Sequence, residues 1–207
     1  MSAIPEIRAP RRSPRRRQVD TARMEELLTQ LEQIVLAEGF TAVTMDDLAQ
    51  RLGCSKATLY SVAGTKDQLV QTVTRRFFQQ AAAQIEAAVA AETDPRVRIR
   101  TYLTGVGTAM RRNSPAFYDD MVSYEPTARI YRKNSDTAAR RVHELITAGI
   151  RSGAFRDVNG TFAARLVAVA IDSVQSGVLL EGSGLTAGDA FSQLGDLLLD
   201  GLSRPTG

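Results

Sequence analysis

The sequence predicts an all-α fold of about nine helices, and three observations support this class. Apolar residues recur at the i, i+3, i+4 and i+7 positions through most of the 207 residues. No stretch alternates apolar and polar residues over the length of a strand. Glycines and Asp-Pro or Ser-Pro pairs divide the periodic stretches into segments of helical length. With 43% hydrophobic residues, the chain can bury a core, as one large domain or as a small domain joined to a larger one.

The first 19 residues are rich in Arg and Pro and poor in apolar side chains. So few apolar groups cannot offset the entropy of ordering the chain, and we expect residues 1–19 to be a disordered basic arm. Such an arm can contact DNA, and the same composition is also typical of a solvated tail, so that the sequence favours neither role. The arginines that would reach DNA are Arg11, Arg12, Arg15, Arg16 and Arg17.

Three helices are expected in residues 20–66. Side chains that can accept a hydrogen bond from a helix N-terminus precede them, namely Asp20 or Thr21, Thr44 and Ser55. Glycine follows the first two helices, where a left-handed residue can redirect the chain. The expected ranges are about 20–38, 44–52 and 56–62.

Six more helices are expected in the second domain, residues 67–207. Thr65 to Gln68 is typical of a capping box, and Asp94-Pro95 and Ser114-Pro115 each place proline directly after a cap. Gly153 and the Gly182-Ser183-Gly184 segment interrupt the later part of the chain. The expected ranges are about 66–92, 95–112, 115–122, 125–151, 161–180 and 186–202.

The net positive charge of the chain is confined to its first third. The net charge is +5 over residues 1–23, −4 over 24–43 and +2 over 44–76, whereas residues 77–207 are neutral. This asymmetry is typical of a protein that binds a polyanion through its N-terminal part.

The composition argues against several other classes of protein. One cysteine cannot form an intramolecular disulfide, and one histidine leaves too few ligands for a His/Cys zinc site. Asp119, Asp120 and Glu125 are close in sequence but lack a metal-binding partner set, so we expect no enzyme and no cofactor. No apolar run is long enough to span a membrane and no secretory signal is present, so we expect a cytoplasmic protein with no membrane partner.

The segment from Thr44 to Leu69 has the layout of a helix-turn-helix unit, with two short helices around a tight turn at Gly53-Cys54. The second short helix offers small and polar side chains, which permit close approach to the major groove of DNA. The residues expected at a base edge or a phosphate are Lys56, Ala57, Thr58, Tyr60 and Ser61, with Ser55 at the cap.

The run from Thr44 to Tyr60, with Lys66-Asp67-Gln68-Leu69 after it, resembles the DNA-binding domain of the TetR (tetracycline-repressor-like) family. The resemblance covers about residues 21–69 and implies phosphate contacts by Thr44 and Lys66. It also implies a homodimeric transcriptional regulator whose C-terminal helical domain binds a small effector and releases DNA. Ala63 stands where the family has a large aromatic residue, which predicts a weaker grip on DNA.

Aromatic and methionine side chains gather in the fifth to seventh expected helices, in a chain with only 6% aromatic residues. Ordinary core packing explains each one alone, but as a group they suit an apolar binding site with a few polar groups. Asp172 interrupts an apolar run, so its carboxylate either pairs, for example with an arginine across a dimer interface, or contacts a polar ligand. The expected pocket residues are Tyr102, Met110, Phe117, Met121, Tyr124, Asp172 and Gln175.

Apolar stripes on the last two expected helices need a partner, and a symmetric contact between two copies would cover both. The expected interface residues are Phe162, Leu166, Val169, Phe191, Leu194 and Leu198. We therefore expect a homodimeric repressor that an effector releases from a pseudo-palindromic double-stranded operator. The alternative is a nucleoid-type protein that binds DNA through the arm without an effector, and sequence preference distinguishes the two.

Overall fold

The computed structural model describes residues 14–203, which form nine α-helices and no strand. The all-α class is therefore confirmed over this part of the chain. None of these helices is both long and apolar enough to cross a bilayer. The helices are α1 (Pro14–Glu38), α2 (Met45–Arg51), α3 (Lys56–Val62), α4 (Lys66–Ala90), α5 (Pro95–Met110), α6 (Pro115–Ser123), α7 (Glu125–Arg151), α8 (Gly160–Gln175) and α9 (Ala187–Leu202).

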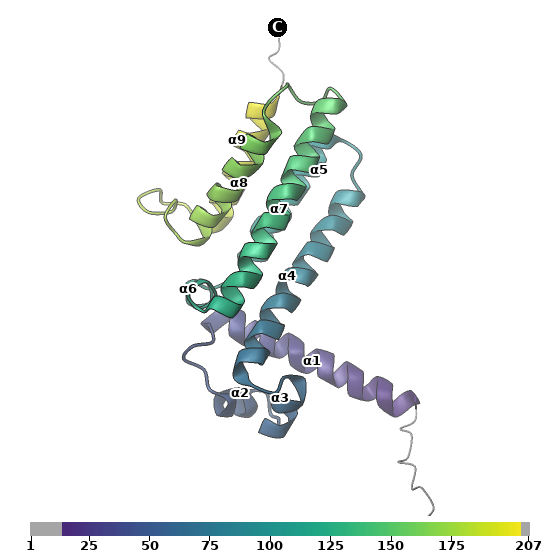
Figure 1. Ribbon diagram of the computed structural model, residues 1–207, viewed down its shortest axis with the longest axis vertical. Coiled ribbons are helices and arrows are strands. Elements are labelled where there is room, and N and C mark those ends of the chain that lie inside the picture. The colour runs from purple at the N-terminus through teal and green to yellow at the C-terminus, as the bar shows by residue number, and fades with distance from the viewer. Residues whose placement is uncertain (1–13, 204–207) are drawn as a thin grey trace, which may run out of the picture.

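The helices form a small unit at one end of a longer bundle (Figure 1). Helices α2 and α3 lie at that end beside the start of α4, and α1 extends sideways from the same end. Helices α4, α5, α7, α8 and α9 run along the long axis, and the short α6 lies near the junction with the small unit. Helix α4 belongs to both parts, because it begins beside α3 and continues along the bundle.

Local capping explains why the short helices begin where they do. Thr44 caps α2 in a reciprocal capping box with Asp47, Ser55 caps α3, and Thr65 caps α4. Gly53, at φ +58°, follows α2 in the left-handed conformation that the tight turn requires. The turn and both short helices therefore lie where the sequence predicted them.

Two helices differ from the expectation. Helix α1 begins at Pro14, so residues 14–19, which we expected to be disordered, are helical; proline suits a first helical position and arginine has good helix propensity. Arg11 and Arg12 lie outside the described residues, as do the side chains of Arg15, Arg16 and Arg17. Helix α8 ends at Gln175 rather than near residue 180, because Gly177 turns the chain at φ +80°.

Two clusters of buried residues hold the fold together. The first combines Leu31 of α1, Leu59 of α3, Phe77 of α4 and Phe117 of α6, each with no exposed area. The second, at the far end of the bundle, contains residues such as Phe155. Burial of one such side chain contributes about 1.5–3 kcal/mol to folding. Since the first cluster includes residues on both sides of position 66, the expected domain boundary is not a break in packing.

Helix α6 is joined to the loop between α1 and α2 by Asp120. Its Oδ2 accepts hydrogen bonds from the backbone amides of Phe40, at 2.6 Å, and Thr41, at 2.8 Å. Burial alone would raise the pKa of Asp120, yet the hydrogen bonds from Thr41 and Phe40 and the charge of Lys66 leave that pKa below its usual value. The carboxylate is therefore ionised at neutral pH and holds the small unit against the bundle.

A buried ion pair reinforces the same junction. Glu32, on α1, is 2% exposed, and its Oε1 accepts a hydrogen bond from Arg112 at 2.5 Å. Arg76 of α4 approaches the other carboxylate oxygen at 3.6 Å. The Arg112 guanidinium also lies 5.5 Å from the centre of the Phe77 ring. A carboxylate this deep in the protein needs such partners, so α1 is held to both α4 and the turn that follows α5.

We predict that Gly39→Ala destabilises the fold more than Gly53→Ala. Both glycines have positive φ, +78° and +58°, and an alanine there costs roughly 1–2 kcal/mol in backbone strain. A Cβ at Gly39 would also lie 2.5 Å from Asp120 Oδ2, whereas one at Gly53 meets no atom within 4 Å. Urea unfolding at equal protomer concentration measures the difference, and equal losses in the two variants would contradict a role for the Asp120 contact.

Candidate nucleic-acid interface and internal cavity

Helix α3 presents a polar surface at one end of the molecule. Leu59 anchors the helix, because its side chain has no exposed area in the first cluster. The remaining expected contacts reach the surface together: Ser55, Lys56, Ala57, Tyr60 and Ser61 are exposed and Thr58 is half-buried. A helix with small side chains on its free face can approach base edges in the major groove.

The serine and threonine hydroxyls on this surface already make hydrogen bonds within the protein. Ser55 Oγ accepts from the Thr58 amide at 3.1 Å and lies 2.9 Å from Thr58 Oγ1. The Ser61 hydroxyl donates to the Thr58 carbonyl at 2.6 Å. Thr44, also exposed, donates its hydroxyl proton to the Asp47 carboxylate at 2.6 Å. These contacts fix the starts of α2 and α3, and they orient the side chains that face outward.

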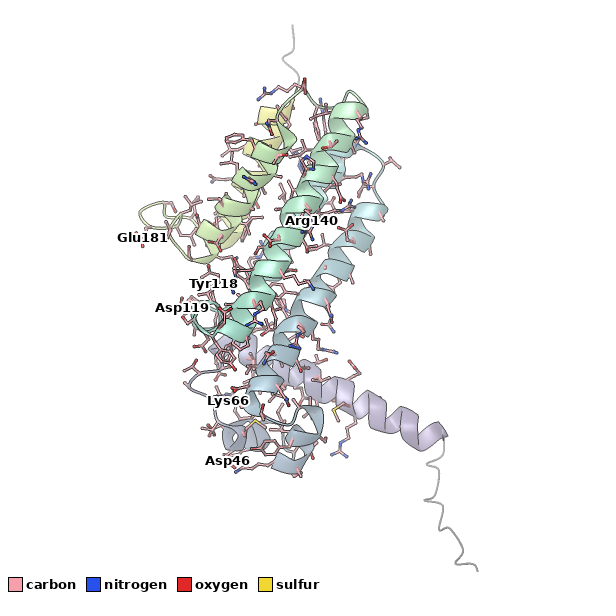
Figure 2. The ribbon with its side chains drawn as sticks, in the orientation of Figure 1. Asp46, Lys66, Tyr118, Asp119, Arg140 and Glu181 are labelled. Atoms are coloured by element: carbon pink, nitrogen blue, oxygen red, sulfur yellow. The ribbon has the colours of Figure 1, made fainter. Side chains whose placement is uncertain are left out.

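Both lysines of the expected interface have partners in the free protein. Lys56 Nζ lies 2.5 Å from the Asp46 carboxylate, and Lys66 Nζ donates to the Thr41 carbonyl at 3.3 Å. Figure 2 shows Asp46 and Lys66 at the end of the molecule formed by α2 and α3. An exposed ion pair contributes little, so a phosphate can replace Asp46 at Lys56. Asp46, in the first turn of α2, was not among the expected site residues.

Ala63 follows α3 as its C-terminal cap and is half-buried against the first cluster, together with Val62. The position therefore packs inward, as the large aromatic residue of the resemblance would, but with less side-chain volume.

A cavity of about 400 Å³, partly open to solvent, lies between α4, α5, α7 and α8. Small side chains from all four helices face one another there, and their lack of volume leaves the space. The apolar lining consists of Phe78, Ala81, Ala82, Ile85, Val106, Ala109, Met110, Ala138, Ala139, Val142, Val167, Ala168 and Ile171. Two tyrosines, Tyr102 and Tyr131, are buried in the wall.

Only Tyr102 and Met110 of the seven expected pocket residues line this cavity. Phe117 and Met121 are fully buried in the first cluster, and the ring of Tyr124 packs edge-on against Phe40 at 6.1 Å. Gln175 lies at the end of α8, in a separate hollow beside Asn113 and Leu180. The helical period did not set the rotation of each helix about its axis, and this rotation decides which side chains face inward.

Asp172 is outside the cavity lining and binds two tyrosines. Its Oδ1 accepts a hydrogen bond from Tyr131 at 2.8 Å and one from Tyr118 at 3.3 Å. Burial, followed by the effect of Asp172, raises the pKa of Tyr131 far above its usual value, so the phenol remains a donor. Within the described chain, two tyrosines therefore bind this carboxylate and join α6, α7 and α8. A further contact with an arginine across a dimer interface or with a ligand stays a prediction.

The exposed apolar face differs in part from the expected interface. Phe162, Leu166 and Val169 are 68%, 55% and 64% exposed along α8. Phe191 is instead 4% exposed and would meet a Cβ at Gly107, so it is a core residue. Leu194 and Leu198 are half-buried, whereas Leu197, on the same apolar stripe of the last helix, is 71% exposed.

A helix-turn-helix unit with an exposed second helix is typical of DNA-binding proteins. Residues 27–73 match the family of bacterial regulatory proteins described as the tetR family. Residues 27–73 therefore form a DNA-binding domain of the TetR type, which is a domain of transcriptional regulators.

Curated relatives agree with this assignment. The chain is 25% identical over 159 residues to the HTH-type transcriptional activator FasR of Mycolicibacterium smegmatis, over 74% of this chain and 71% of the relative. It is 41% identical over 54 residues to the uncharacterized HTH-type transcriptional regulator YvaF of Bacillus subtilis, over 26% of this chain and 28% of that protein. Both relatives carry the name of a regulator.

Solved structures share the whole fold. A TetR transcription regulator from Haloarcula marismortui superposes with a TM-score of 0.73 at 19% identity, over 89% of this chain and 100% of that one. A putative regulator from Saccharomonospora viridis, solved with choline, has a TM-score of 0.73 at 19% identity, over 89% and 99%. The ketosteroid regulator KstR2 of Mycobacterium tuberculosis has a TM-score of 0.61 at 21% identity, over 88% and 95%. At these identities the likeness concerns the fold.

We predict that Lys56→Gln weakens binding to all DNA sequences by a similar factor. A lysine that neutralises one phosphate adds about one counterion to the salt dependence, so the slope of log K against log salt should fall by about one. Fluorescence anisotropy with two unrelated duplexes measures this slope. The matched control is Lys133→Gln, an exposed lysine on α7, and an equal effect of both changes would place the DNA elsewhere.

Proposed function

We propose that this regulator is a cytoplasmic homodimer that represses transcription and leaves its operator when a small molecule occupies the internal cavity. The observation that carries this proposal is the continuity of α4. The helix begins at Lys66, beside the expected DNA surface, and contributes Phe78, Ala81 and Glu86 to the cavity 12 or more residues further on. A displacement of α4 by a ligand is therefore transmitted to the DNA-binding unit.

The junction supports this coupling because it leaves the small unit little freedom to move independently of the bundle. Asp120 holds the α1–α2 loop to α6, and Glu32 holds α1 to Arg112 at the end of α5. A ligand shifts the equilibrium only by the difference in its affinity for the DNA-competent and released forms. An effector that fits the cavity better in the released form would lower operator affinity.

The apolar face of α8 and α9 supports the dimer. Phe162, Leu166 and Val169, together with Leu197, form a face that water solvates poorly. A two-fold contact would pair this face with itself and place two α3 helices to read the half-sites of a pseudo-palindrome. The proposed interface therefore keeps the α8 residues of the expected set. On α9 it includes the exposed Leu197 in place of Phe191, whose side chain is buried.

DNA binding is tested by titrating the protein with its own upstream DNA and with a scrambled duplex, over a series of salt concentrations. We expect a strong preference for the upstream DNA, with protection of two half-sites. Equal affinities that fall steeply with salt would favour the alternative, a nucleoid-type protein that contacts phosphates alone.

Repression is tested by transcription from the same promoter. Loss of transcription on adding protein supports the proposal, whereas a gain would make this chain an activator, which is what the name of its relative FasR says of that protein.

We predict that Leu166→Glu converts the dimer to a monomer and lowers operator affinity. A charge on this face cannot be buried unpaired, and loss of the second half-site removes an avidity factor on the order of 10²-fold. Analytical ultracentrifugation and anisotropy measure the two effects. Val97→Glu, at a 37% exposed valine on α5, is the control and should remain a dimer; a dimeric Leu166→Glu variant would disprove the proposed face.

A further inference from the structure

The cavity wall contains a tyrosine whose hydroxyl has no hydrogen-bond partner among the described residues. Tyr102, on α5, is 6% exposed and lines the cavity, and its hydroxyl makes no hydrogen bond with any residue of the described chain. Burial, followed by the negative charge of Glu86, raises its pKa to about 12. The hydroxyl therefore carries its proton at neutral pH and is available as a donor to a molecule inside the cavity.

The other buried tyrosine of the wall is already engaged. The Tyr131 hydroxyl donates to Asp172 at 2.8 Å, and its ring packs between Phe78 and Tyr118 at 6.2 and 5.9 Å. At this end of the cavity the rings of Phe78 and Tyr131 supply apolar surface, and the half-buried Asn134 and Ser135 line the cavity beside them. A ligand would place its apolar body here and its polar atom at Tyr102.

The charged groups of the lining balance one another. Glu86 and Arg141 form two hydrogen bonds of 2.8 Å between α4 and α7, and Arg141 also binds Glu144 at 3.0 Å. Arg140, labelled on α7 in Figure 2, donates to Thr137 at 2.9 Å. Two acids and two bases line the cavity, so the wall offers no net charge to neutralise an ion.

We infer that the effector is an uncharged, mainly apolar molecule that presents one hydrogen-bond-accepting oxygen, such as a carbonyl, to Tyr102. This inference rests on the proposed function in one respect, namely that the bound molecule acts as an effector of DNA release. The binding preference of the cavity does not depend on DNA release. A volume of about 400 Å³ lies toward the small end of the range for ligand sites, which suits a compact body of one or two rings.

Matched probes that differ in one group test the class of ligand. N-phenyl-1-naphthylamine, a neutral dye that fluoresces in apolar sites, reports occupancy of the cavity. Benzophenone and diphenylmethane then compete for the site, because they share a shape and differ by the carbonyl oxygen. We expect benzophenone to bind about fivefold more tightly, which is the factor that one neutral hydrogen bond contributes. Diphenylacetate and (diphenylmethyl)trimethylammonium, the anionic and cationic counterparts, should each bind more weakly than benzophenone.

Tyr102→Phe removes only the hydroxyl and should abolish the preference for benzophenone over diphenylmethane while dye binding remains. Ala138→Phe should fill the cavity and abolish dye binding. Its control is Ala148→Phe, at an exposed position on the same helix outside the lining, which should bind the dye normally. The two α7 variants keep the test decisive even if Tyr102→Phe fails to fold.

Four outcomes would overturn the inference. These are tighter binding of either charged probe than of benzophenone, an unchanged preference in folded Tyr102→Phe, and no dye binding to the wild-type protein or equal dye binding to both α7 variants. Operator affinity is measured in parallel with saturating benzophenone. If the probes show the expected preference but DNA stays bound, the proposed release of DNA is wrong and the inferred ligand class is supported. If a charged probe binds best and releases DNA, the inferred ligand class is wrong and the proposed release is supported.

Discussion

Asp120 accepts hydrogen bonds from two successive amides of the loop between α1 and α2, and the relation between the two parts of the molecule depends on this contact. The loop has room for the carboxylate because Gly39 has no side chain. Glu32 acts in parallel on α1, where Arg112 and Arg76 partner a charge that is nearly sealed from water. Hydrogen bonds to charged groups are worth more than neutral ones, so this junction is a stiff connection within a marginally stable fold.

The cavity is lined by α4, one of the helices to which this junction holds α1. Alanines occupy facing positions on α4, α5, α7 and α8, so the bundle forgoes packing that larger side chains would supply. Met110 lines the hollow and also belongs to the first cluster, which contains Leu31 and Leu59 of the DNA-binding unit. A molecule that fills the hollow would therefore press on the core that supports α3, and a stiff junction would pass this strain to the expected DNA surface.

Local signals in the sequence were reliable where a single turn of backbone decides the structure. Thr44, Ser55 and Thr65 cap helices as predicted, and Gly53 turns the chain between α2 and α3. These signals act through hydrogen bonds and backbone conformations within a few residues. Periodicity was less reliable at the ends of segments. It missed residues 14–19 of α1, which have no apolar stripe, and it carried α8 past Gly177 because Val178, Leu179 and Leu180 continue the apolar run.

The sequence by itself determined the all-α class, the helix-turn-helix segment and the exposed α3 residues, because each follows from contacts between residues close in the chain. Only the tertiary structure decided which side chains surround the cavity, that Asp172 binds Tyr118 and Tyr131, and that Phe191 is core while Leu197 is exposed. These outcomes depend on how each helix is rotated against its neighbours. That rotation is set by packing among many residues distant in sequence, and a single apolar stripe is compatible with several rotations.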